Sequence, residues 1–266
     1  MPKLVWLTDI HLNFVSDNEV AAFLETVKNE MPDAVLVGGD IGEAHSLAKY
    51  LEQMAHAWPC RVYFVLGNHD FYHGSLAGVR QMTRELCQRY DNLVYLSDSE
   101  PIALTDHLAL IGHDGWADAR VGDYMRSVVM MNDYRLIDEL SHLSKEERWD
   151  VLLGLGNEAA EYVQQALTKA LEAYPRVLFL THVPPLRDAC WYDGKISDDE
   201  WAPHFTCMAV GHTLIDLMRI YPDRSLTVFC GHTHGEGICN PLPNITIHTG
   251  RAQYGQPAIT KILDVV

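Results

Sequence analysis

Five short apolar runs recur along the chain, and they predict five β-strands. None of them alternates cleanly between apolar and polar residues. Such runs are typical of strands that are covered on both faces, as in an α/β protein. The runs are Leu4–Leu7, Ala34–Val37, Val62–Leu66, Val177–Leu180 and Leu226–Phe229.

Helical periodicity fills much of the sequence between these runs. Apolar residues there recur every three or four positions, so they would line one face of a helix. Ser16 and Glu19 fit a capping box at the start of the first helix, and Pro175 and Pro222 end the last two. The expected helices cover residues 16–31, 47–58, 76–86, 162–171 and 210–221.

The remaining segments complete the expected architecture. Residues 101–112 predict a β-hairpin and residues 258–266 a final strand. No linker divides the chain, so we expect one domain spanning residues 1–266. The segments 113–155 and 183–206 fit neither pattern and hold Trp, Tyr, Arg and Gly. Loops of this composition often carry function, so we expect them to shape a binding pocket.

Composition narrows the classes of function. The chain has 36 acidic and 20 basic residues, a net charge of −16, which argues against a nucleic-acid partner. Its six cysteines form no CxxC pair, and the first apolar run is too short for a signal peptide. No run reaches the roughly 18 apolar residues of a membrane span. We therefore expect a cytoplasmic protein with reduced thiols.

Each of the five apolar runs stops at a cluster of polar residues. Taken singly these clusters are weak signals, because an Asp after a strand often caps a helix and a lone His is often a core residue. Five such clusters at five strand ends indicate a site, since ligands gather at the carboxyl ends of strands in α/β sheets. The clusters are Asp9 with His11, Asp40, Asn68 with His69 and Asp70, His182, and His232 with His234.

A metal centre would explain why so many carboxylates and imidazoles converge. Burying polar or charged groups costs free energy unless a partner replaces their lost hydration, and a cation is such a partner. Imidazole and carboxylate without thiolate suit Zn, Mn, Fe, Ni or Co. There are more candidate ligands than the four that a tetrahedral zinc site needs, so two metals that share a bridging carboxylate fit the set better.

The order of these motifs resembles the calcineurin-like metallophosphoesterase superfamily. The pattern of that family is D-x-H, G-D, G-N-H-[DE], H and G-H-x-H. In this chain it reads DIH at 9–11, GD at 39–40, GNHD at 67–70, His182 and GHTH at 231–234. The resemblance implies an α/β fold, a four-layer αββα sandwich of two β-sheets flanked by helices. The metal site would lie at the carboxyl ends of the strands.

The same resemblance implies a role for each motif residue. Two divalent metal ions would be bound, with Asp40 as the bridge between them. His69 would act as the general acid, supported by Asp70. The first metal would be held by Asp9, His11 and His234, and the second by Asn68, His182 and His232.

The implied reaction is hydrolysis of a phosphodiester or phosphomonoester by a metal-bridging hydroxide. His69 would protonate the leaving oxygen. The alternative is a catalytically silent metal-binding scaffold for protein–protein interaction. The presence of His69 and of every ligand position favours the enzyme.

The substrate pocket has weaker candidates. We expect a small phosphoester substrate, because the chain is short and acidic. An arginine could hold its phosphate and a tryptophan could stack on a ring, although both types are more often surface or core residues. The sequence leaves the oligomeric state open. The pocket candidates are His73, Trp116, Arg120, Arg126 and Arg251.

Overall fold

The computed structural model describes residues 2–265 and contains two large β-sheets. The first has five strands in the order β13-β1-β2-β3-β4. Its central strands are parallel, and only β13 runs antiparallel to its neighbour β1. The strands are β1 (Lys3–Leu7), β2 (Ala34–Gly38), β3 (Arg61–Val65), β4 (Leu93–Tyr95) and β13 (Lys261–Asp264).

The second sheet has six strands in the order β11-β12-β10-β7-β6-β5. The four inner strands are parallel, while β5 and β11 lie antiparallel at the edges. Both sheets therefore direct the carboxyl ends of several parallel strands to one edge. The strands are β5 (Ile102–Thr105), β6 (Leu108–His113), β7 (Arg176–Thr181), β10 (Ser225–Cys230), β11 (Gly237–Leu242) and β12 (Ile245–Thr249).

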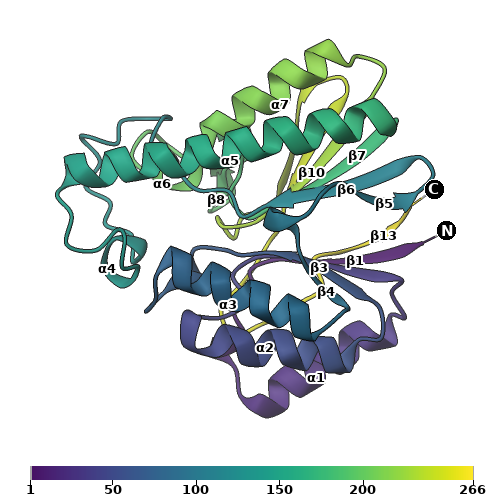
Figure 1. Ribbon diagram of the computed structural model, residues 1–266. Helices are drawn as coiled ribbons and strands as arrows, with labels where there is room; N and C mark the ends of the chain where they lie inside the picture. Colours follow the sequence, from purple (N-terminus) through teal and green to yellow (C-terminus); the bar gives the residue numbers. More distant parts are fainter. Residues whose placement is uncertain (1, 266) are drawn as a thin grey trace.

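Helices cover the outer face of each sheet, which makes four layers (Figure 1). The first sheet is covered by α1 (Asp17–Asn29), α2 (Ala44–Ala57) and α3 (Leu76–Arg89). The second is covered by α5 (Lys145–Ala173) and α7 (Met208–Ile220). This arrangement confirms the predicted αββα sandwich.

Buried apolar side chains hold the layers together. One cluster lies between the first sheet and its helices, a second between the other sheet and α5 and α7, and a third between the two sheets. In the third cluster the ring of Trp6 lies 4.7 Å from that of Phe229, so a residue of each sheet meets at the centre. Full burial of side chains of this size contributes about 1.5–3 kcal/mol each.

The predicted helices form, and apart from the start of α5 their ends lie within three residues of the expected ones. The expected capping box is present at α1, where Glu19 Oε2 accepts from Ser16 N at 2.8 Å. Met31 lies beyond the end of that helix and is exposed. Helix α5 begins at Lys145, so residues 145–155 are helical and not irregular as expected. A capping box between Ser144 and Glu147 starts this helix.

The rest of the two irregular segments lies at the opposite end of the sheets from the chain termini (Figure 1). They contain only short elements: α4 (Asp133–Leu136), the small hairpin β8 (Trp191–Tyr192) and β9 (Lys195–Ile196), and α6 (Ala202–Phe205). Within residues 2–265 the chain also forms four 3-10 turns: η1 (Leu12–Phe14), η2 (His69–Phe71), η3 (Leu96–Asp98) and η4 (Arg187–Ala189).

Candidate metal centre

The fold brings all the predicted metal ligands to one edge of the two sheets. Each of them lies within four residues of the end of a parallel strand. Strands β1, β2 and β3 of the first sheet provide four ligands, and β7 and β10 of the second provide three. The residues are Asp9, His11, Asp40, Asn68, His182, His232 and His234.

The backbone of this site is strained. Five of the seven predicted ligands have a positive φ, a conformation that residues other than Gly rarely adopt. Each such residue costs of order 1–3 kcal/mol unless its surroundings enforce it, and such residues concentrate at functional sites. The five are Asp9 (φ 51°), His11 (41°), Asp40 (52°), His232 (70°) and His234 (57°).

Two glycines allow the loops to approach one another. A Cβ atom on Gly67 would overlap Asp40 Oδ1, and a Cβ atom on Gly231 would overlap Asp9 Oδ2. Only a residue without a side chain fits at these two positions. The glycines of the GNHD and GHTH motifs therefore make room for the carboxylates of the other motifs.

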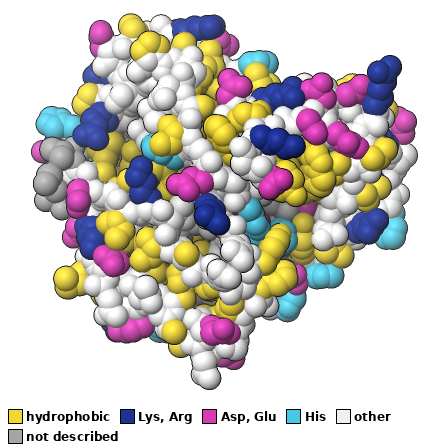
Figure 2. Space-filling model, turned by 180° about the vertical axis from the view of Figure 1, so that it is seen from behind, with side chains coloured by type: hydrophobic (Ala, Val, Ile, Leu, Met, Phe, Trp, Pro, Cys, Tyr) yellow, Lys and Arg dark blue, Asp and Glu magenta, His cyan; other side chains and the backbone are white. Residues whose placement is uncertain are grey.

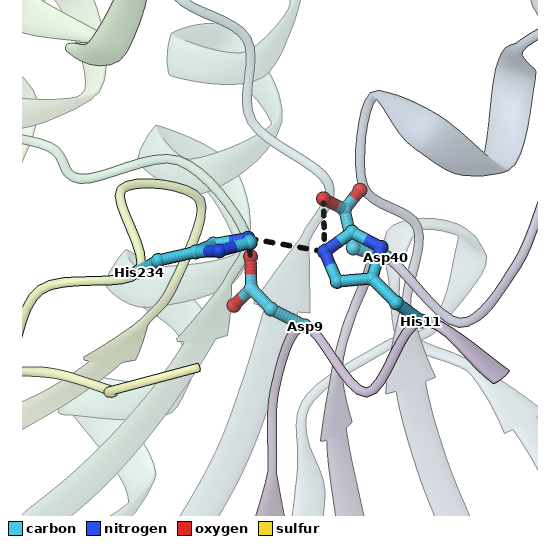
Figure 3. A group of neighbouring side chains, drawn as sticks. All are labelled: Asp9, His11, Asp40 and His234. Carbon is cyan, nitrogen blue, oxygen red and sulfur yellow. Dashed lines mark hydrogen bonds and ion pairs between the residues drawn. The ribbon is translucent and has the colours of Figure 1, made fainter. Parts of the chain in front are cut away.

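One group of four side chains converges on a single point (Figure 3). The ligand atoms of Asp9, His11, Asp40 and His234 all lie within 4.8 Å of one another. The two imidazole Nε2 atoms are 3.0 Å apart, His234 Nε2 is 3.5 Å from Asp9 Oδ1, and His11 Nε2 is 3.6 Å from Asp40 Oδ2. We call these four residues the Asp9 group.

Burial and neighbouring charges shift the pKa values of two members of this group, His11 and Asp40. It lowers the pKa of His11 to about 4, although Asp40 acts in the opposite direction, so the imidazole is neutral near pH 7 and keeps a free lone pair. Burial alone would raise the pKa of Asp40, but the imidazoles of His182, His69 and His11 hold that pKa below its ordinary value. Neutral imidazole and ionised carboxylate are the forms that bind metal ions.

A second group surrounds the side-chain oxygen of Asn68. This Oδ1 atom lies 3.0 Å from His182 Nε2 and 2.9 Å from His232 Nδ1. The other ring nitrogen of each histidine faces a backbone carbonyl: His182 Nδ1 is 2.8 Å from Gly38 O, and His232 Nε2 is 3.0 Å from His204 O. All three side chains are buried. We call Asn68, His182 and His232 the Asn68 group.

Asp40, a member of the Asp9 group, also faces the Asn68 group. Its Oδ2 faces His11 of the Asp9 group at 3.6 Å, and its Oδ1 faces His182 of the Asn68 group at 3.4 Å. Oδ1 also accepts a hydrogen bond from the backbone N of His69 at 2.9 Å. Its two oxygens are thus divided between the two groups.

His69 lies beside both groups and is partly open to solvent. Its ring packs 4.3 Å from that of Tyr72 and 4.7 Å from that of His11. Its Nδ1 atom is buried and has no hydrogen-bond partner among residues 2–265. Its Nε2 atom lies 3.4 Å from the hydroxyl of Tyr254. The two ring nitrogens of His69 therefore have different surroundings, Nδ1 being enclosed and Nε2 facing the Tyr254 hydroxyl.

Asp70 does not contact the His69 ring, which corrects the expected support. Its Oδ1 accepts from the backbone N–H groups of Ile41 and Gly42 at 2.9 Å each, and its Oδ2 accepts from Gly67 N at 2.8 Å. Burial and the neighbouring Asp40 raise the pKa of Asp70 to about 7. Through these three hydrogen bonds Asp70 ties the loop after β2 to the loop after β3.

Two of the five pocket candidates make contacts within the protein that account for their side chains. Trp116 is a core residue, 4% exposed, and its ring packs 5.7 Å from Phe71. Arg120 is turned toward α5, where it donates to Asn157 Oδ1 at 2.6 Å, and it also binds Asp118. Burial and ion pairing therefore correct the expectation that these two residues line the pocket.

The other three candidates are exposed. His73 Nε2 lies 4.0 Å from Glu43 Oε2, and Arg126 lies 3.6 Å from Asp123 Oδ2. Arg251 lines a cavity of about 540 Å³ that also touches Asp9 and Lys261. On the face seen in Figure 2, Lys or Arg side chains lie close to a gathering of histidines near the middle of the molecule.

Several residues near the site gave no signal in the sequence. Tyr254 lies over the Asp9 group, with its ring 4.5 Å from His11 and 4.8 Å from His234. Asp133 and His204 lie in the two irregular segments and contact the Asn68 group. A lone Tyr or Asp in a loop has many ordinary explanations, so only the folded structure reveals these contacts.

The residues of the Asp9 group fit a metal ion. Four ligand atoms from three loops approach one point, and all are carboxylate oxygens or imidazole nitrogens. Two ring nitrogens that face each other at 3.0 Å, with a carboxylate beside each, are well placed to share a cation.

Comparison with known families agrees with this chemistry. The family described as calcineurin-like phosphoesterase matches residues 2–236. The chain belongs to the calcineurin-like phosphoesterases. Membership makes it a hydrolase of phosphoester bonds with a dinuclear divalent metal centre, and the Asp and His cluster of this phosphoesterase suits that centre. No curated protein matches the sequence.

Solved structures share the fold of this phosphoesterase. A phosphopantetheinyl hydrolase from Mycobacterium tuberculosis superposes with a TM-score of 0.64 at 14% identity, covering 95% of this chain and 90% of its own. A dimetal phosphatase from Danio rerio superposes with a TM-score of 0.58 at 15% identity, covering 97% and 90%. A protein from Thermus thermophilus gives 0.53 at 11% identity, covering 94% and 89%. At these identities the likeness concerns the fold alone.

Within residues 2–265, no helix combines the length and the apolar character needed to cross a bilayer.

Proposed function

We propose that this calcineurin-like phosphoesterase hydrolyses a small phosphodiester or phosphomonoester with two divalent cations, and that His69 is the general acid. The observation that supports this most is the position of Asp40. Each of its oxygens faces a buried histidine of a different group, His11 at 3.6 Å and His182 at 3.4 Å. A carboxylate placed in this way can serve two cations at once.

In this proposal the two groups divide the cations between them. Asp9, His11 and His234 hold one, while Asn68, His182 and His232 hold the other, and Asp40 contributes to both. When bound, a pair of divalent cations lowers the pKa of water and offsets the negative charge of the phosphoryl group. The protein contributes the positions of the ligands, which the strained loops and the surrounding hydrogen bonds fix before any cation binds.

His69 supplies the proton in this proposal. Hydrolysis of a phosphoester places negative charge on the leaving oxygen, and a positioned acid that neutralises it typically contributes about 10²–10⁴ in rate. The Nε2 atom of His69 points toward the Tyr254 hydroxyl and partly toward solvent, whereas its Nδ1 atom is buried. A leaving group that enters beside Tyr254 would therefore meet Nε2.

Hydrolysis of two chromogenic esters tests the proposed activity. The metal-free protein is assayed with bis-p-nitrophenyl phosphate and p-nitrophenyl phosphate after addition of Mn²⁺, Zn²⁺, Co²⁺, Ni²⁺ or Fe²⁺. We expect turnover of at least one ester with at least one cation, Mn²⁺ being tested first, and none after chelation. The ratio of the two rates then decides between diester and monoester. A protein that binds cations but hydrolyses neither ester under any condition would favour the scaffold.

A further inference from the structure

The orientation of the Asn68 amide determines what the Asn68 group offers to a cation. An amide has an acceptor at its oxygen and two donors at its nitrogen, and only the oxygen can bind a metal ion. In the structure the oxygen faces His182 and His232. The nitrogen faces the opposite way, where Nδ2 donates to Asp133 Oδ1 at 2.8 Å and lies 3.2 Å from the Tyr72 hydroxyl.

Asp133 enforces this orientation because an ionised carboxylate can only accept hydrogen bonds. If the amide rotated by 180°, its oxygen would face the Asp133 carboxylate, and its nitrogen would face the cation site. The hydroxyl of Tyr72 donates to the same Asp133 oxygen at 2.7 Å. Two donors, Asn68 Nδ2 and the Tyr72 hydroxyl, thus converge on Asp133 Oδ1, which leaves this oxygen the role of acceptor.

The backbone around α4 fixes Asp133 in turn. Asp133 is only 5% exposed, although it lies in a short helix of an otherwise irregular segment (Figure 1). His73 N donates to Leu136 O at 2.7 Å, and Asp138 N donates to Gly74 O at 3.1 Å. These bonds join α4 to the chain that follows Asn68, so the carboxylate and the amide belong to one connected unit.

Asp133 completes the hydrogen bonding behind the Asn68 group. In each member of that group, the polar atom on the side away from the cation site has a hydrogen-bond partner. His182 Nδ1 pairs with Gly38 O, His232 Nε2 with His204 O, and Asn68 Nδ2 with Asp133 Oδ1. Partners of this kind orient metal ligands, and their loss typically costs 10–100-fold in metal affinity. In the Asp9 group, by contrast, His11 Nδ1 is buried without a partner among residues 2–265.

We infer that Asp133 is a positioning residue that holds the oxygen of Asn68 toward the cation site of the Asn68 group. It acts through Asn68 and touches neither cation nor substrate. Loss of its carboxylate lets the amide rotate and weakens the binding of one cation, while the cation of the Asp9 group is unaffected. The inference rests on the two-cation centre of the proposed function.

Metal titration of Asp133→Leu and Asp133→Asn tests this role without any assay of activity. Mn²⁺ binding to the metal-free proteins is followed by isothermal titration calorimetry, and folding by circular dichroism. We expect Asp133→Leu to bind one of its two Mn²⁺ ions about 10–100-fold more weakly. Asp133→Asn retains an acceptor oxygen, so we expect a smaller loss at the same site. Asp138→Asn, at an exposed carboxylate of the same segment, provides the matched control.

The outcomes separate this inference from the proposed function. A wild-type protein that binds no Mn²⁺ would refute the two-cation centre itself. If the wild type binds two ions and a folded Asp133→Leu protein binds both with unchanged affinity, or loses both equally, the positioning role is wrong. Should Asp133→Leu fail to fold, Asp133→Asn decides: a loss confined to one ion supports the role, and no loss overturns it.

Discussion

At the scale of single residues, the His69 imidazole has different surroundings on its two sides. Aromatic rings of Tyr72 and His11 pack against it at 4.3 Å and 4.7 Å, and Nδ1 is buried. Its Nε2 atom lies 3.4 Å from the Tyr254 hydroxyl. The imidazole is thus held in place by packing, since Asp70 binds the backbone and not the ring.

Replacement of His69 should separate chemistry from metal binding. We expect His69→Asn to lower kcat by about 10²–10⁴, because the proton donor is lost, while the content of bound metal stays that of the wild type. Steady-state kinetics with a phosphoester and elemental analysis of the same sample measure the two quantities. His107→Asn, at an exposed histidine in the turn between β5 and β6, serves as the control. Unchanged kcat in His69→Asn would exclude the assigned role.

At the scale of elements, the site is made by the loops that follow parallel strands. Five predicted ligands have a positive φ, and hydrogen bonds between neighbouring loops keep them there. Asp9 N donates to Gly39 O at 3.1 Å, and His11 N donates to Asp40 O at 2.9 Å. The loops after β1 and β2 therefore support each other, and a change in one moves ligands of the other.

A pair of glycine substitutions tests this close approach. In Gly231→Ala the added methyl group would overlap Asp9 Oδ2, so we expect weaker Mn²⁺ binding and a lower melting temperature. Gly154 lies in helix α5 with nothing within 4 Å of an added Cβ atom, and Gly154→Ala should stabilise the protein by about 0.5–1 kcal/mol. Calorimetric titration and thermal unfolding compare the two. Equal effects of both substitutions would argue against crowding at Gly231.

The sequence predicted the strands and the clusters that follow them because both are local signals. Apolar runs identify strands, and each short motif contains its metal ligands within a few consecutive residues. Asp133, His204 and Tyr254 carry no such signal, since their roles depend on residues at least 28 positions away. The start of α5 was missed because the apolar periodicity is weak at its N-terminal end, where the capping box of Ser144 begins the helix.

At the scale of the whole molecule, the candidate centre joins the two sheets. The Asp9 group combines Asp9, His11 and Asp40 from the first sheet with His234 from the second. The Asn68 group likewise combines Asn68 with His182 and His232. A cation bound to either group would cross-link the two halves of the sandwich.

Removal of the cations should therefore destabilise the entire fold. A ligand present at 100 times its Kd adds about 2.7 kcal/mol to the free energy of unfolding. For a chain of this size each kcal/mol corresponds to roughly 2–4 °C in Tm. We expect Tm to fall by several degrees in EDTA and to recover on addition of excess Mn²⁺, as measured by scanning calorimetry. Identical unfolding curves with and without EDTA would contradict a cross-link between the sheets.

The central claim is that two cations share Asp40, and anomalous diffraction from crystals grown with Mn²⁺ measures this most directly. We predict two anomalous peaks, one against Asp9, His11 and His234 and the other against Asn68, His182 and His232, with an oxygen of Asp40 bound to each. A single peak, two peaks that do not share Asp40, or none at the strand ends would contradict the account.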